Sequence, residues 1–280
     1  MKNLKKWITS PIATVILFAA SAGLLLFSTI GGARAAFLAI SETYTGQVEM
    51  YDIGVSLLEK SAQDEQPKEV AHRNYIKNSQ DQWDETKGVL LSNLLAKGEE
   101  FVPGKEYTEE LSVANTGTIN EWVRVTIYKY WTDPQGNKVF TDANAKGEST
   151  PGLAPSLIKL TPANVDSGDG NGAWILDTEA SSQTEERTVY YYNKLLNSGA
   201  DTTSTPLTSK LSVDTSVAKK VTQTVSEDKK TIVTSYDYDG WRFCIEATVD
   251  AVQERNAVDA IKSAWGRDVS FRENGTMVLE

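Results

Sequence analysis

The chain has 280 residues, 40% of them hydrophobic, with 28 Lys and Arg, 38 Asp and Glu, one His and one Cys. A chain of this length can bury a sizeable core, and its single cysteine excludes the class of small domains stapled by internal disulfides. The formal net charge of −10 argues against a nucleic-acid partner, because phosphate groups repel an acidic surface.

The first 35 residues have the three parts of a secretory signal peptide. Three of the first six residues are lysines, residues 12–30 form an uncharged apolar run, and Ala33 and Ala35 are small residues three and one before a cleavage site. We therefore predict that signal peptidase cuts between Ala35 and Ala36. The alternative is that the apolar run, close to the roughly 20 residues that span a bilayer, remains as an anchor. Either interpretation places the remaining chain outside the cytoplasm.

The remaining chain, residues 36–280, is more acidic than the whole. The signal segment contains four basic and no acidic residues, so its removal leaves 24 Lys and Arg against 38 Asp and Glu, a formal charge of −14. A soluble, acidic chain that is exported without disulfides suits the surface of a Gram-positive bacterium.

The first part of residues 36–280 predicts one strand, one loop and one helix. Residues 47–58 predict a strand in which the parity of the hydrophobic residues changes, so that a bulge near Tyr51 and Asp52 is needed to keep them on one face. Residues 61–78 are polar and predict a surface excursion. Residues 85–95 predict a short helix with four leucines on one face, although Gly88 disfavours it.

Strand signals dominate the middle and the end of the chain. Apolar and polar residues alternate over 123–128 and 241–250, and the second pattern places Cys244 on the polar face as an inert thiol. Residues 133–137 predict a turn. Residues 221–225 and 231–236 predict a hairpin. Residues 142–151 and 197–205 predict loops.

A second helix is predicted near the C-terminus. Asn256 can cap it, Val258, Ile261 and Trp265 are spaced three and four apart on one face, and Gly266 can end it. Short strands, turn-rich connections and one or two short helices together indicate a mainly β protein, with one β-sandwich domain over residues 36–280.

The sequence shows little that could carry catalysis. His72 is the only histidine, so neither a two-histidine zinc helix nor an alternative base for a Ser or Cys nucleophile is present. We expect His72 to be a solvated surface residue. Residues 166–172 are rich in Gly, Asp and Asn, which fits either a flexible turn or a weak calcium loop. We predict no catalytic, cofactor or metal residues.

Three stretches together resemble the TasA/camelysin family of exported Gram-positive proteins. They are Gly31-Gly32-Ala33-Arg34-Ala35-Ala36-Phe37; Pro103-Gly104 followed by Asn115-Thr116-Gly117 and Val123-Arg124-Val125; and Asp250-Ala251-Val252-Gln253 followed by 256–265. The resemblance implies a jelly-roll-like sandwich, a signal removed by a SipW-type peptidase, and a subunit of extracellular matrix or biofilm fibres. It also implies partnership with copies of itself and with other matrix proteins.

The resemblance further implies that the segment after the cleavage site pairs with a neighbouring subunit. Here that segment is 36–45, and its apolar residues are Phe37, Leu38, Ile40 and Tyr44. These side chains are too apolar for a solvated tail, so we predict an assembly strand; the alternative is a strand that folds back onto its own sheet. Two other functions stay open: a secreted camelysin-like metallopeptidase and a module that binds cell-wall polymers or carbohydrate.

Overall fold

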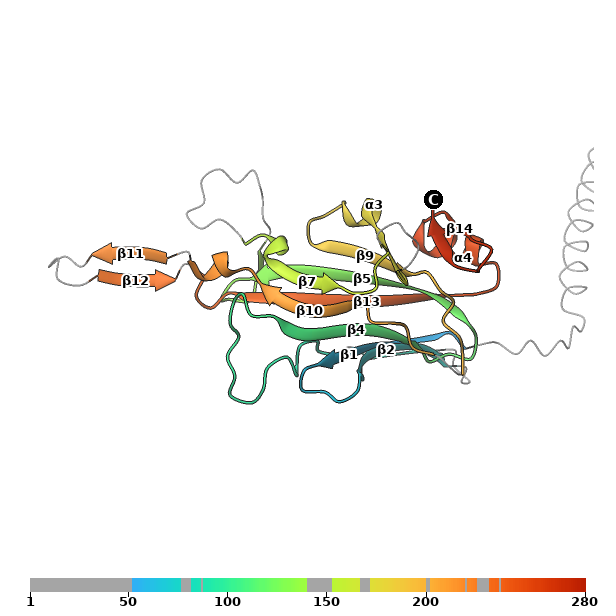
Figure 1. Ribbon diagram of the computed structural model, residues 1–280, viewed down its shortest axis with the longest axis horizontal. Coiled ribbons are helices and arrows are strands. Elements are labelled where there is room, and N and C mark those ends of the chain that lie inside the picture. The colour runs from blue at the N-terminus through green and yellow to red at the C-terminus, as the bar shows by residue number, and fades with distance from the viewer. Residues whose placement is uncertain are drawn as a thin grey trace, which may run out of the picture. The chain divides into compact units, whose positions relative to one another are not determined.

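The computed structural model describes residues 52–76, 82–86, 88–139, 153–166, 172–199, 202–219, 221–225, 232–236 and 238–280. The signal segment 1–35, its cleavage site and the predicted assembly strand 36–45 lie outside this part. The described chain is mainly β, as the sequence predicts (Figure 1).

Most strands belong to two antiparallel sheets. The six-stranded sheet has the order β3-β2-β1-β4-β10-β7, formed by Gln82–Glu85, Lys68–Ile76, Gly54–Ser61, Tyr107–Asn115, Thr208–Val213 and Ile158–Pro162. The five-stranded sheet has the order β13-β5-β9-β8, formed by Arg242–Gln253, Glu121–Thr132, Arg187–Tyr192 and Trp174–Asp177, and β6 (Lys138–Val139) also pairs with β5. Two hairpins stand apart from these sheets: β11 (Val221–Val225) with β12 (Ile232–Tyr236), and β14 (Val269–Phe271) with β15 (Met277–Leu279).

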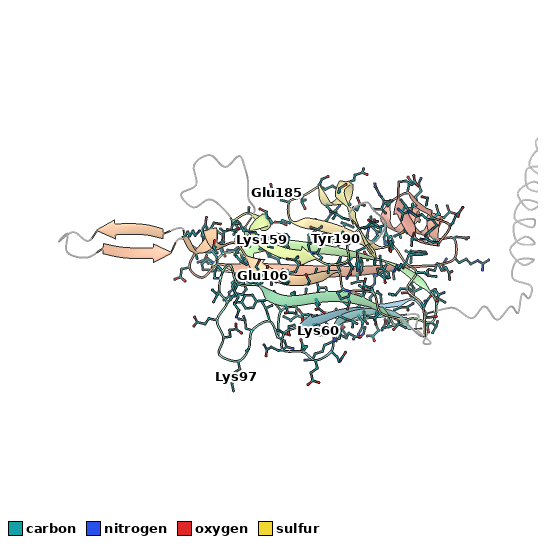
Figure 2. The ribbon with its side chains drawn as sticks, viewed as in Figure 1. Lys60, Lys97, Glu106, Lys159, Glu185 and Tyr190 are labelled. Carbon is teal, nitrogen blue, oxygen red and sulfur yellow. The ribbon has the colours of Figure 1, made fainter. Side chains whose placement is uncertain are left out.

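The two large sheets pack face to face and enclose the main core. Val123, Val125 and Ile127 of β5 are almost fully buried, and they share one cluster with Leu111 and Val113 of β4. The predicted alternation over 123–128 is therefore confirmed, because the odd positions face the opposite sheet. Figure 2 shows the labelled charged side chains Lys97 and Glu185 pointing outwards, whereas Tyr190 lies within the layers.

From β4 onwards, the chain changes sheet at most connections. It passes from β4 in the larger sheet to β5 in the smaller, then to β7, back to β8 and β9, then to β10 and finally to β13. This alternation between two facing sheets is the connection pattern of a jelly roll. From β4 onwards, most sequence neighbours therefore lie in different layers, whereas β1, β2 and β3 pair in sequence order within the larger sheet.

The C-terminal helix forms as predicted, with a different buried face. Helix α4 (Ala257–Trp265) ends at Gly266, whose N–H donates to the carbonyl of Lys262. Asn256 precedes it without a side-chain cap bond, and Val258 is exposed. Its buried residues Ala257 and Ile261 pack in a second cluster with Trp122 and Tyr191, on the side of β5 and β9 that faces away from the main core.

The predicted helix over 85–95 is wrong. Residues 82–85 form β3 and the segment from Gly88 to Leu95 is a series of turns, in which Leu91 has a positive φ of 65°. The Leu91 N–H donates to the Glu59 carboxylate at 2.6 Å, which holds a conformation that no helix contains. Leu94 is nevertheless buried, so these leucines cover the core from a loop.

One other local prediction needs correction. Residues 61–78, predicted as a surface excursion, contain β2, which pairs with β1 through 68–74 despite its polar side chains. The first described strand, β1, begins at Gly54, and its ladder with β2 shifts register between Leu57 and Leu58, where Val70 of β2 is the extra residue. Residues 47–51 lie outside the described chain, so the bulge predicted near residue 51 stays a prediction. The hairpin at β11–β12 and the turn at 133–137 are confirmed.

The other short helical pieces connect strands. They are α3 (Thr178–Ser181), capped by the Asp177 carboxylate on the Ala180 N–H, and 3-10 turns at Pro155–Leu157 and Thr215–Lys219. With α4, two α-helices are present in the described residues, in line with the sequence expectation.

The turn at 115–117 explains the Asn-Thr-Gly motif. Buried Asn115 donates from its side-chain amide to the carbonyls of Ile119 and Leu196, and accepts from the Gly117 N–H at 2.8 Å. A Cβ on Gly117 would lie 2.4 Å from the Asp52 carbonyl oxygen, so only glycine fits this approach. The turn thereby ties the start of β1 to the start of β5.

Glu121 and Glu109 are the most deeply buried carboxyl groups among the described residues. Glu121 is 0% exposed and accepts a hydrogen bond from the Gly54 N–H at 2.9 Å, and burial raises the pKa of its carboxyl to about 8. Glu109 is also buried, and desolvation together with the nearby Glu59 carboxyl raises its pKa far above the ordinary value. Both groups are therefore protonated in the folded protein at mildly acidic pH.

Candidate functional site

Strand β13 forms one edge of the five-stranded sheet. Each of its residues from Arg242 to Gln253 has a partner on β5, and no described strand pairs with its other edge. In an antiparallel edge strand, every second residue directs its N–H and C=O away from the sheet. The outer edge of β13 is therefore a row of backbone donors and acceptors that an added strand can use.

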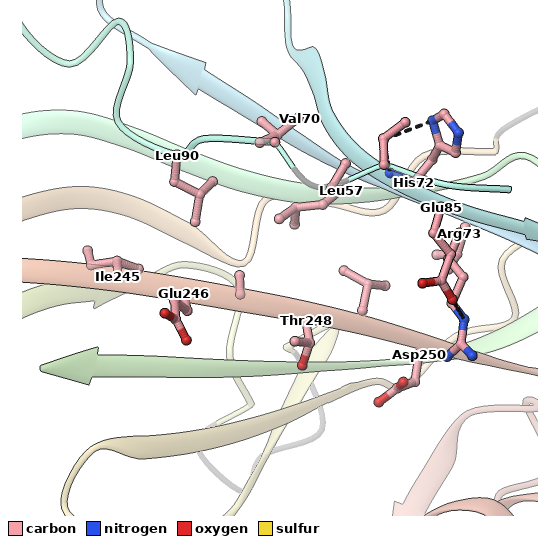
Figure 3. A pocket seen from close by; sticks show the side chains of 16 residues that line it. Leu57, Val70, His72, Arg73, Glu85, Leu90, Ile245, Glu246, Thr248 and Asp250 are labelled. Carbon is pink, nitrogen blue, oxygen red and sulfur yellow. Dashed lines mark hydrogen bonds and ion pairs between the residues drawn. The ribbon is translucent and has the colours of Figure 1, made fainter. Parts of the chain in front are cut away.

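A groove of about 610 Å³ runs along this edge. Its walls come from β1 and β2 of the larger sheet, from the segment that follows β3, and from residues 245–250 of β13. In Figure 3, Leu57 and Leu90 point towards Ile245 across the groove. The apolar part of its lining consists of Val55, Leu57, Val70, Ala71, Leu90, Ile245, Ala247 and Val249.

The groove depends on a close approach between β2 and the segment after β3. A Cβ on Gly88 would lie 1.7 Å from the carbonyl oxygen of Val70, so this backbone contact requires glycine. The approach places Leu90 over the groove. The glycine that disfavours a helix in the sequence is thus needed for packing against β2.

His72 lies at the rim of the groove between two carboxylates. Its Nδ1 is 2.7 Å from Glu69 Oε1 and its Nε2 is 3.2 Å from Asp84 Oδ2, which links β2 to β3. The side chain is 17% exposed, so His72 is a surface residue as expected, but it is partly buried and hydrogen-bonded rather than freely solvated. The hydrogen bond to Glu69 is the main reason that the pKa of His72 is raised above 6.5.

The rest of the rim is polar and charged. Arg73 pairs with Glu85 at 2.7 Å across the β2–β3 ladder, and Glu246, Thr248 and Asp250 of β13 complete the rim. Both partners of the Arg73 pair are about half exposed, so the pair adds little to stability. An apolar floor with a charged rim suits the binding of an extended peptide with one apolar face.

The predicted site residues lie only partly within the described chain. Ala35, Ala36, Phe37, Leu38, Ile40 and Tyr44 lie outside it, as do residues 167–171 of the candidate calcium loop. Cys244 is half-buried, does not line the groove, and lies on the polar face of β13 as predicted. Among the described residues, no group of three or more His, Cys, Asp and Glu side chains is arranged to hold a metal ion.

The groove does not follow from the sequence pattern. The alternation over 241–250 predicts β13 as a strand, but neither the edge position of β13 nor the pairing of β2 with β1 follows from a local pattern. Gly88 was the available signal, because a glycine within a leucine-rich segment can mark a close backbone approach.

Within the described residues, no helix is long and apolar enough to cross a membrane. Comparison of the chain with protein-family models, curated proteins and solved structures finds no significant match.

Proposed function

We propose that this chain is an exported structural protein that assembles with copies of itself into fibres of an extracellular matrix or cell surface. In this proposal, segment 36–45 of one copy adds as a strand to the outer edge of β13 in the next copy. The observation that carries the proposal is the groove beside that unpaired edge. The protein acts through this contact and has no catalytic role.

The segment is long enough to fill the groove. Residues 245–250 of β13 line the groove and span about 20 Å when extended, whereas ten residues span about 33 Å. Leu38, Ile40 and Tyr44 have the same parity, so an added strand would direct all three towards the apolar lining. Burying them would contribute about 1.5–3 kcal/mol each before the costs of association.

Release of the segment by signal cleavage would couple assembly to export. A subunit that still carries residues 1–35 has no free end to insert, and assembly before export is thereby prevented. The likeness of the three sequence stretches to TasA/camelysin proteins supports the same function.

The test uses the mature chain, residues 36–280, in electron microscopy and light scattering. We expect filaments from this protein and monomers from a variant lacking residues 36–40. Val70→Lys should also block assembly, because it places a charge in the groove. Val89→Lys is the matched control, since Val89 is 76% exposed and does not line the groove.

Mixing the two assembly-defective variants sharpens the test. The deletion variant keeps an intact groove and Val70→Lys keeps an intact segment, so together they should form a one-to-one complex that does not grow. Filaments from the deletion variant would refute the proposal. A large loss of melting temperature in the dilute deletion variant would show instead that the segment folds back onto its own sheet.

A secreted peptidase is the competing function. Cleavage of casein by purified protein, abolished by a chelator, would refute the structural proposal.

A further inference from the structure

A second cleft lies away from the main core, against the outer face of the five-stranded sheet. It has a volume of about 320 Å³, within the range of small-molecule sites. Strands β5, β9 and β13 form its floor, and its walls are the α3 segment and the residues that end α4. The groove along β13 and this cleft share only Thr248 and Asp250. The side chains of a strand alternate between its two faces, so the groove and the cleft lie mainly on opposite faces of β13.

Three arginines and three carboxylates line the cleft, and their charges balance. Arg124 donates from Nη2 to Asp250 at 2.6 Å, and Arg267 pairs with Glu179. The third carboxylate, Asp177, has a fully buried side chain and lies 3.7 Å from Arg267 Nε. The third arginine, Arg187, donates to the Ala180 carbonyl at 2.6 Å and to the Gln183 side chain at 2.9 Å.

The cleft also has an aromatic wall. The guanidinium of Arg124 lies over the ring of Trp265, 5.2 Å from its centroid, and Tyr191 packs edge-on against Trp265 at 5.4 Å. These contacts fix the position of the indole at the end of α4. Trp265 is only partly buried, so part of its surface remains available.

The charge balance selects the class of ligand. The charges of the lining sum to zero, so a charged ligand would leave the cleft with a net charge, which is costly in a partly buried site. A hydroxyl group can accept from an arginine and donate to a carboxylate at once, without disturbing the balance. A sugar ring adds an apolar C–H face that can pack on an indole.

We propose that this cleft binds a neutral saccharide, either free or as a unit of a polysaccharide. Arg124, Arg187, Arg267 and Gln183 supply donors, Glu179 and Asp250 supply acceptors, and Trp265 supplies the apolar contact. The cleft shares only Thr248 and Asp250 with the groove along β13, so a fibre subunit can hold polysaccharide while it is assembled.

The test is calorimetric titration of the mature protein with glucose, N-acetylglucosamine and their β-linked disaccharides, with glucuronate and glucosamine as charged comparisons. We expect at least one neutral saccharide to bind saturably and more tightly than both charged sugars. If the protein binds insoluble polysaccharide but none of the soluble sugars, the cleft recognises a sugar unit only within a polymer.

Charge variants distinguish this cleft from other surfaces. Glu179→Gln leaves the cleft with an excess positive charge, so binding of the neutral sugar should weaken about tenfold while glucuronate gains affinity. Glu185→Gln, an exposed change that lies outside the cleft, should leave both affinities unchanged. Gln183→Ala should weaken neutral sugar binding without altering the melting temperature, since Gln183 is exposed.

Three results would overturn the proposal. The first is that the protein binds no neutral saccharide saturably and does not bind insoluble polysaccharide. The second is that the unmodified protein binds glucuronate or glucosamine more tightly than neutral sugars. The third is that Glu185→Gln weakens sugar binding as much as Glu179→Gln does.

Discussion

Replacing Glu121 by Gln should make the stability of the protein less dependent on pH. The Glu121 carboxyl is fully buried and accepts from the Gly54 N–H, and burial raises its pKa from 4.5 to about 8. Glutamine keeps the shape and the accepting oxygen but cannot ionise. The substitution therefore removes the ionisation and preserves the bond that joins the start of β5 to the start of β1.

The sign and size of the effect follow from proton linkage. Because the pKa is raised in the folded state, stability is greatest below pH 4.5 and falls as the pH rises to about 8. One pKa unit corresponds to about 1.4 kcal/mol, so the loss between pH 4.5 and 7 is about 3 kcal/mol. In a domain of this size that corresponds to about 6–12 °C in melting temperature.

The substitution also has a cost that does not depend on pH. The new amide nitrogen takes the place of Glu121 Oε2, which is buried and has no hydrogen-bond partner among the described residues. An unsatisfied buried donor costs about 1–3 kcal/mol at every pH. We therefore compare the free energies of unfolding of the variant and the unmodified protein at each pH. The informative quantity is how their difference changes with pH.

Urea unfolding of the mature chain, dilute enough to stay monomeric, measures this difference from pH 4.5 to 8.5. We expect the free energy of unfolding of Glu121→Gln, relative to that of the unmodified protein, to rise by about 3 kcal/mol between pH 4.5 and 7. Glu273→Gln, an exposed change, is the control and should show no such trend. Parallel stability curves for Glu121→Gln and the unmodified protein would show that Glu121 ionises normally and would refute the reasoning.

Three further predictions address pH, the rim histidine and export. The unmodified protein should lose stability from pH 5 to 9 in urea unfolding, since ionisation of both Glu109 and Glu121 opposes folding in this range; a flat profile would contradict this. His72→Ala should lower the free energy of unfolding by about 1 kcal/mol at pH 5.5 and by much less at pH 9. A raised histidine pKa adds stability at low pH, and this stability is lost as the proton leaves. Equal losses at both pH values would show that the histidine charge is not the cause. Sequencing of exported protein should start at Ala36, and bulky residues at positions 33 and 35 should block maturation; a start at Met1 would exclude cleavage.

Much of the fold follows from local sequence patterns. The alternation over 123–128 and 241–250 predicted β5 and β13, and the spacing of Ile261 and Trp265 predicted α4. These predictions succeed because each element buries one face, and burial of one face imposes a period of two on strands and about 3.6 on helices. The mainly β class followed from the same patterns.

The candidate site did not follow from such patterns. Strand β2 has few apolar residues and is held by its ladder with β1, while the leucines of 85–95 are held in a loop by the Glu59 carboxylate and the contact at Gly88. Both depend on partners brought together by the fold, so local propensity gave the wrong answer.

The sequence by itself determined that the described chain builds a mainly β sandwich, and which faces of β5 and β13 carry apolar residues. Only the tertiary structure decided that β13 lies at an edge, that a groove runs beside it, that His72 is held by two carboxylates, and that the charges of α3 and α4 meet over β5. The physical reason is that a strand's side-chain pattern reports burial of its faces, whereas its edge partners use the backbone, which is the same in every residue except proline.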